Sequence, residues 1–227
     1  MNQALVDYPQ LLAEGQNPEE LALQSLVNRA LLSQAAREAG FTADAQMVTD
    51  KLAKLTDQAG GEEAFNAWLS AQGYTKESFE LELPGELEAA WQRDQLAAAV
   101  PESMEQVRAR QLLFYEEFAA DRIYKQLSAG VPVDQVVANN DAENTGYLGW
   151  LPRGVLIYPE LEDALFSLEP GGFSPVIHTE AGYHIMIMLE KQNDYPLSSE
   201  LRLALQEKAV QTWLETQRTQ AVIEVLP

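Results

Sequence analysis

The sequence contains no cysteine among its 227 residues. This absence excludes disulfides, a thiolate nucleophile and zinc sites built on cysteine, and it fits an oxidising compartment, where stray thiols are a hazard. A glycine-rich phosphate loop, a cluster of metal ligands and a nucleophile elbow are also missing. We therefore expect no cofactor and no metal, and nothing favours hydrolase, transferase or nucleotide chemistry.

Long apolar runs are missing as well. No stretch approaches the roughly 18 residues that a membrane-spanning helix needs, and the first residues, Met1-Asn2-Gln3-Ala4, do not resemble a signal peptide. We expect contact with a membrane only through an anchor that has been removed.

Basic residues are scarce. The chain has thirty-five acidic residues and only fifteen lysines and arginines, which gives a formal net charge of -20. A surface this acidic repels phosphate backbones, so a nucleic-acid partner is not expected. Residues 1–106 hold 18 acids and 6 bases and so carry -12 of this charge. A partner that uses this field should be neutral or basic, and unfolded polypeptide satisfies that condition.

The first hundred residues show helical periodicity with helix-capping residues at regular intervals. Asn17 is a favourable N-cap for a helix that Gly40 ends, Thr42 can cap a second, and Thr75 a later one. Pro84-Gly85 is expected to kink or break that later helix. The segment from Val100 to Ser103 resembles a domain boundary.

Residues 179–188 predict a turn that leads into a buried strand, with His184 at its start. The sequence has only two histidines, which makes His184 a candidate for chemistry. A lone histidine in this position is nevertheless more often a structural residue with satisfied hydrogen bonds. The segments around it are therefore needed to interpret it.

These segments occur in the order found in the parvulin-type (PpiC, rotamase) peptidyl-prolyl isomerases. The resemblance runs from about Gln106 to Lys191 and rests on the blocks Val107–Phe114, Glu116–Ala129, Ala138–Asp141, Gly146–Trp150, Pro159–Leu168, Pro170–Val176 and Thr179–His184. It implies a domain with an antiparallel sheet that catalyses cis–trans isomerisation of X–Pro bonds.

The tail combines an amphipathic helix from Ser198 to Gln220 with an alternating strand-like segment, Val222–Leu226. One helix and one strand cannot bury their own apolar faces, so this tail must dock on the N-terminal helices. Helices, an inserted globular block and a returning helix together resemble the SurA- and PrsA-like extracytoplasmic foldases. The resemblance implies an α+β chain in an extracytoplasmic (periplasmic or cell-surface) location, with unfolded or proline-containing polypeptides as clients. The expected parts are a helical chaperone domain at 1–103, the parvulin-like domain at 104–194, and 195–227 returning to the helical domain.

The parvulin resemblance also implies site residues. His184 matches the second histidine of the family, Thr179 the hydroxyl residue and Asp141 the Cys/Asp position, whereas Gln111 replaces the first histidine. The loop that follows Asp141 is about two residues shorter than usual. The residues implied to line the proline slot are Leu148, Leu156 and Leu161, the last in place of the usual phenylalanine.

Three classes of function remain open: a foldase, a pure holdase chaperone with a degenerate parvulin-like domain, and a structural interaction protein. Each site residue also has a structural interpretation, since the three leucines suit any core and Asp141 suits a turn. The loop Tyr115-Glu116-Glu117 has the wrong charge for phosphate, so specificity for phosphopeptides is not expected.

Overall fold

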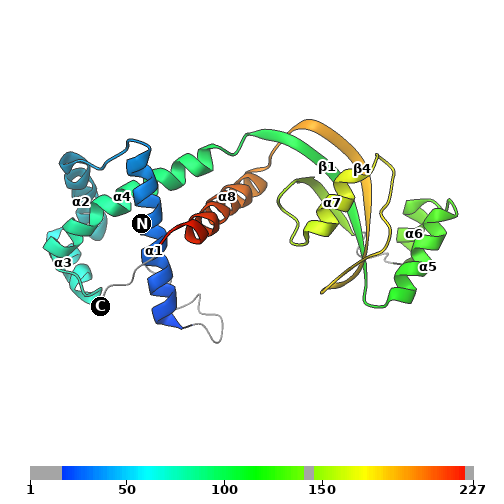
Figure 1. Ribbon diagram of the computed structural model, residues 1–227, viewed down its shortest axis with the longest axis horizontal. Helices are drawn as coiled ribbons and strands as arrows, with labels where there is room; N and C mark the ends of the chain where they lie inside the picture. The colour runs from blue at the N-terminus through cyan, green and yellow to red at the C-terminus, as the bar shows by residue number, and fades with distance from the viewer. Residues whose placement is uncertain (1–16, 141–145, 223–227) are drawn as a thin grey trace. The chain divides into compact units, whose positions relative to one another are not determined.

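The computed structural model describes residues 17–140 and 146–222 (Figure 1). These residues form two compact units. The helical unit runs to Ala99 and includes the chain from Ala209 onward, and the sheet unit runs from Val100 to Lys208. The expected site residue Asp141, and the expected terminal strand beyond Val222, lie outside the described residues.

The helical unit contains four helices and the second half of a fifth. Their bounds are α1 Pro18–Glu38, α2 Ala45–Ala59, α3 Glu62–Ala71, α4 Lys76–Ala98 and α8 Ser199–Gln220. Two of the expected caps are confirmed: the Asn17 side chain accepts a hydrogen bond from the backbone N–H of Glu19, and Thr75 forms a reciprocal capping box with Ser78. Helix α2 starts later than expected from Thr42, because the Asp44 side chain accepts from the N–H of Met47 and so caps the helix.

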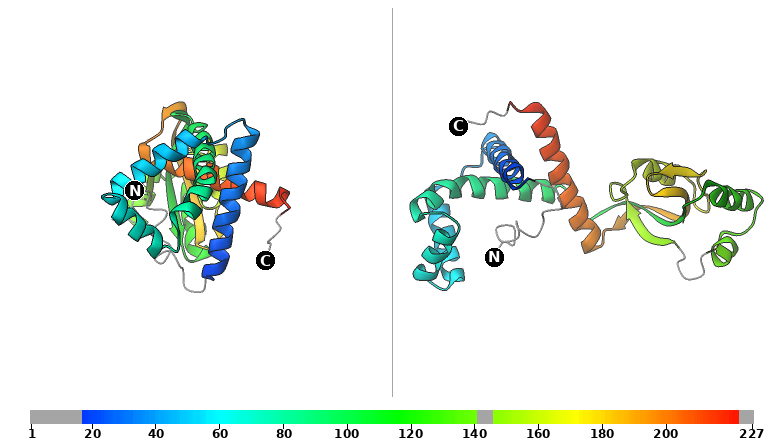
Figure 2. Two further views of the ribbon diagram at one scale, coloured as in Figure 1. Left: turned by 90° about the vertical axis from the view of Figure 1, so that its left-hand side faces the viewer. Right: turned by 90° about the horizontal axis from the view of Figure 1, so that it is seen from below.

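Helix α4 continues through Pro84-Gly85, so of the kink or break expected at this point the break does not occur. The proline removes one backbone donor, but packing along the helix outweighs that loss. Leu83 and Ala89, on either side of the proline, are both buried, and α4 packs across α1 (Figure 2).

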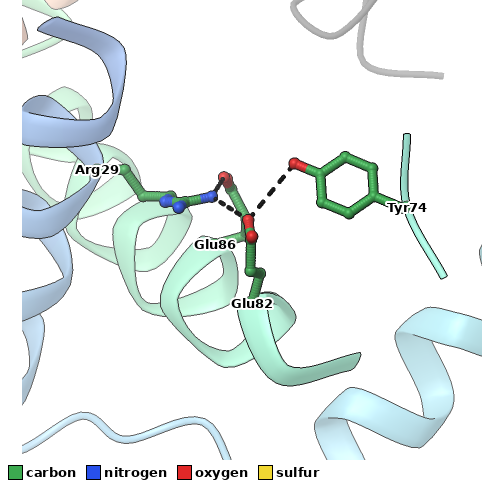
Figure 3. Close-up of polar contacts among 4 residues, drawn as sticks. All are labelled: Arg29, Tyr74, Glu82 and Glu86. Carbon is green, nitrogen blue, oxygen red and sulfur yellow. Dashed lines mark hydrogen bonds and ion pairs between the residues drawn. The ribbon is translucent and has the colours of Figure 1, made fainter. Parts of the chain in front are cut away.

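Polar contacts reinforce the α1–α4 packing (Figure 3). Arg29 Nη1 donates to Glu82 Oε2 at 2.9 Å and to Glu86 Oε1 at 3.0 Å. Glu88 is buried, and its Oε2 accepts from Ser33 Oγ at 2.6 Å. A buried carboxylate without a partner would be costly, so this contact ties α4 to α1.

One apolar cluster of the helical unit joins α1, α4 and α8. It consists of Leu32, Ala89 and Leu214, with Leu31, Leu96, Val210 and Trp213 packed against it. The C-terminal helix therefore supplies part of this cluster.

The sheet unit has four antiparallel strands in the order β2-β1-β4-β3. Its elements are β1 Ser103–Phe114, α5 Glu117–Ser128, α6 Val133–Asn140, β2 Tyr147–Pro152, α7 Pro159–Ser167, β3 Ile177–Thr179 and β4 Gly182–Pro196. The last residues of β4 pair with the start of β1, where Ser103 lies opposite Pro196.

Helices cover both faces of the central strands. On one face α7 contributes Leu161, Leu165 and Phe166 to a cluster with Val107, Ala109, Met186 and Met188. On the other face α5 and α6 pack against the alternate residues of β4, Ile185 and Ile187. In Figure 1, α7 and the α5–α6 pair accordingly lie on opposite sides of the sheet. The chain has the α+β fold class expected from its sequence.

Within the described part of the chain, no helix is both long and apolar enough to cross a membrane. The same residues contain no group of three or more histidine, aspartate or glutamate side chains that could hold a metal ion.

Candidate functional site

The candidate site lies on the α7 face of the sheet. Side chains alternate along a strand, so Gln111 falls on the same face as Val107 and Ala109, and His184 on the same face as Met186 and Met188. Three strands meet at His184, because Leu113 of β1 and Ile177 of β3 both lie opposite it. The sheet thus brings together residues more than seventy positions apart.

His184 is held on both sides of its ring. Gln111 Nε2 lies 2.7 Å from His184 Nδ1, and Thr179 Oγ1 lies 2.7 Å from His184 Nε2. An amide –NH₂ group can only donate, so Nδ1 accepts and the proton of the neutral imidazole is assigned to Nε2, which donates to Thr179. The same hydroxyl oxygen accepts from the backbone N–H of Ala181 at 3.1 Å. These contacts orient the imidazole.

The three polar residues differ in exposure. His184 is 1% exposed and Thr179 is 6% exposed, whereas Gln111 is half-buried. The backbone N–H of Gln111 donates to the Gly146 carbonyl oxygen at 2.8 Å, which fixes its position beside β2. His184 and Thr179 therefore form the buried base of the site.

The three expected slot residues share one apolar cluster on this face, but their exposure differs. Leu161 of α7 is 3% exposed and serves as core, whereas Leu148 and Leu156 are half-buried. Tyr158 belongs to the same cluster, and its ring centroid is 6.1 Å from that of His184. The sequence interpretation missed Tyr158, although an aromatic residue directly before the Pro159 that opens α7 was a usable signal.

A β-bulge sets the position of Leu148. Ala109 of β1 lies opposite Gly149 and Arg110 lies opposite Tyr147, so Leu148 has no partner on β1. The neighbouring Gly149 has φ 76°, in the left-handed region that favours glycine. Bulges of this kind re-aim a side chain next to a functional site.

We expect Gly149→Val to lower the free energy of unfolding by about 1–3 kcal/mol, because a β-branched residue is strained at positive φ. A Cβ at this position would meet no atom within 4 Å, so the expected loss is assigned to backbone strain. Asparagine tolerates this conformation, so Gly149→Asn should lose less than half as much. Urea titration measures both variants, and equal losses would contradict the strain argument.

Burial lowers the pKa of His184, and the nearby Glu160 carboxylate opposes that shift by favouring the charged ring. The Gln111 –NH₂ donor acts in the same direction as burial, because a protonated Nδ1 could not accept from it. Burial and this hydrogen bond therefore both favour the neutral imidazole over the charged one.

This lowered pKa predicts that stability decreases in mild acid. The unfolded chain protonates this histidine from about pH 6.5 and the folded chain only at lower pH, so the free energy of unfolding falls as pH falls below about 6.5, by at most ~1.4 kcal/mol per pH unit. Above that pH the contribution is fully present. Urea titrations from pH 7.5 to 5 on the wild type and on His184→Asn test this. Both proteins carry the same carboxylates, so the contribution of carboxylate titration to stability cancels in the difference between the two curves. A flat difference curve would refute the assignment.

The fold and these contacts define a class: a parvulin-type sheet domain joined to a helical domain. Comparison with family models agrees. Residues 1–91 match the SurA-like N-terminal domain and residues 99–190 match the PPIC-type PPIASE domain. The chain therefore combines a SurA-like N-terminal domain with a PPIC-type peptidyl-prolyl isomerase domain.

Relatives of known name are similar to much of this chain. The foldase protein PrsA of Caldanaerobacter subterraneus subsp. tengcongensis is 32% identical over 183 residues, which cover 74% of this chain and 56% of the relative. The chaperone SurA of Alcanivorax borkumensis is 29% identical over 133 residues, 54% of this chain and 29% of the relative. The chain thus spans little more than half the length of the first of these relatives and less than a third of the second.

A solved structure supports the fold. The peptidylprolyl isomerase PrsA from Bacillus cereus superposes with a TM-score of 0.59 at 21% identity, over 92% of this chain and 85% of that one. At this identity the likeness establishes the fold alone.

Proposed function

We propose that this protein is a foldase, which binds unfolded polypeptide and isomerises X–Pro bonds in its sheet unit. The observation that carries the proposal is the placement of His184 between Gln111 and Thr179, on the sheet face that also presents Leu148 and Leu156. The two matched domain families support it, and the relatives of this chain include proteins named foldase and chaperone.

Prolyl isomerisation breaks no covalent bond, but it must overcome a rotational barrier of about 18–20 kcal/mol. A catalyst needs an apolar slot that holds the proline ring and polar groups that favour the twisted amide over the planar one. In this proposal Leu148 and Leu156 form the slot. Tyr158 supplies the flat wall that Leu161, buried in the core and lacking a ring, does not provide.

The polar residues take different roles in this proposal. His184 and Thr179 are buried, so they act as positioning residues that orient the half-buried Gln111 toward the bound amide. Asp141 is proposed, from its match to the family position, as the group near the substrate carbonyl.

The proposed clients are unfolded or proline-containing polypeptides. The net charge of -20 favours neutral or basic clients over nucleic acid. A location outside the cytoplasm is proposed from the PrsA and SurA relatives and fits the absence of cysteine.

A protease-coupled assay on a short proline peptide tests the isomerase. We expect the wild type to accelerate isomerisation and Tyr158→Leu to lower kcat/KM about fivefold, the effect of losing an aromatic contact worth roughly 1 kcal/mol. The matched variant Tyr158→Phe keeps the ring and should retain activity. Equal activity in the leucine and phenylalanine variants would remove Tyr158 from the slot.

A pure holdase is the second candidate. Gln111 favours it, because glutamine cannot titrate near neutrality as the family's first histidine can. The same assay separates the two: a wild type that suppresses aggregation of an unfolded client but leaves the proline peptide unaccelerated would be a holdase.

A further inference from the structure

Helix α2 has an apolar face that its own unit covers only in part: Val48, Leu52 and Leu55 are half-buried. It is a 15-residue amphipathic helix, yet none of its residues is buried. A helix of this length normally owes its stability to packing of its apolar side. A partner could therefore complete the burial of this half-buried face of α2.

This face forms one wall of a groove. Four residues of α2 at helical spacing, Ala45, Val48, Thr49 and Leu52, face four residues of α4 at the same spacing, Glu77, Glu80, Leu81 and Pro84, and Ala43 and Asp44 complete the lining. The groove has a volume of about 580 Å³, which lies in the range of ligand pockets. Leu81 is 82% exposed, an unusual degree for a leucine in a groove wall.

The charged residues of the groove all have one sign. Asp44, Glu77 and Glu80 line it, and no lysine or arginine does. Among the described residues, none of the three carboxylates takes part in a salt bridge. Hydrogen bonds at the start of α4, from backbone N–H and Thr75, lower the pKa of Glu77 and keep it ionised.

We infer that this groove is a docking site for basic, amphipathic polypeptide: a client segment whose apolar side chains enter between α2 and α4 while flanking lysines or arginines meet the three carboxylates. The inference rests on the proposed foldase function and specifies where, and by what chemistry, the helical unit holds a client. Apolar anchors in a groove between helices are an established mode of peptide recognition. A second copy of this chain is a poor occupant of the groove. Its net charge of -20 would be repelled by the three carboxylates that line the groove.

The test is direct binding of labelled peptides to the full chain by fluorescence anisotropy. The probe is a proline-free peptide of leucines and lysines, with matched peptides in which glutamine or glutamate replaces every lysine. Omitting proline keeps the proposed isomerase slot out of the measurement. We expect the lysine peptide to bind most tightly, the glutamine peptide less tightly and the glutamate peptide least tightly. These differences in affinity should shrink as the salt concentration rises.

Two exposed positions supply the variants, each with a matched control. Glu80→Lys should lower the affinity for the lysine peptide about fivefold, or roughly 1 kcal/mol. Glu63→Lys, outside the groove on α3, should change this affinity less than about twofold. Leu81→Gln should also weaken binding about fivefold, whereas Leu203→Gln, a 55% exposed leucine outside the groove, has no effect. Circular dichroism confirms that the variants are folded.

Three results would overturn the inference: equal binding of lysine and glutamate peptides, equal effects of Glu80→Lys and Glu63→Lys, or a dimer that Leu81→Gln dissociates. Aggregation assays of the same proteins separate this inference from the function it rests on. If the wild type and both groove variants suppress aggregation equally, only the groove is wrong. If the wild type neither suppresses aggregation nor isomerises proline, the proposed function fails.

Discussion

His184→Ala will lower the free energy of unfolding of the sheet unit by about 2–4 kcal/mol, because it removes the His184 partner of the Gln111 amide, breaks one of the two hydrogen bonds at the Thr179 hydroxyl and opens a cavity. If the site is active, the same change will reduce isomerisation about tenfold or more, since the polar groups lose their orientation. Urea titration gives the first quantity and the protease-coupled assay the second, at a temperature where both proteins remain folded.

The other histidine supplies the control. His178 is exposed, and its ring packs against the Tyr183 ring at 4.6 Å between centroids. His178→Ala should therefore cost less than about 0.5 kcal/mol and leave activity unchanged. Wild-type activity that survives His184→Ala would exclude this histidine from the isomerase site.

Leu214→Ala will destabilise the helical unit by about 2–4 kcal/mol, the usual cost of removing a buried leucine side chain. Leu214 is 8% exposed and packs with Leu32 and Ala89, so α8 is expected to hold α1 and α4 in place. Hydrogen exchange resolved by segment measures the effect, with lost protection in α1 and α4 but not in β1 and β4.

Leu203→Ala is the matched control on the same helix, because Leu203 is 55% exposed. Its expected cost is within about 0.5 kcal/mol, as for other surface substitutions. If both alanine variants leave the protection of α1 and α4 unchanged, the helical unit does not depend on α8.

Much of the fold could be predicted from local sequence. The caps at Asn17 and Thr75 are local contacts between residues two or three positions apart, so their side-chain chemistry predicts them directly. The parvulin-like segments likewise indicated the antiparallel sheet. The start of α2 and the path of α4 through Pro84 were not predictable in this way. Two acceptable caps lay close together in one case, and packing against α1 outweighed the missing N–H in the other.

The candidate site, too, was predictable from the sequence only in part. The sequence by itself determined which residue types stand at the site, including Gln111 in place of a histidine and leucines where the slot was expected. Only the tertiary structure decided what these residues do for one another. Strand pairing brings Gln111 and Thr179 to opposite sides of the His184 ring, burial makes Leu161 core while Leu148 and Leu156 reach the surface, and Tyr158 comes to lie beside the histidine. The physical reason is that exposure and side-chain contacts depend on which segments pack together, and in this chain those segments are far apart in sequence.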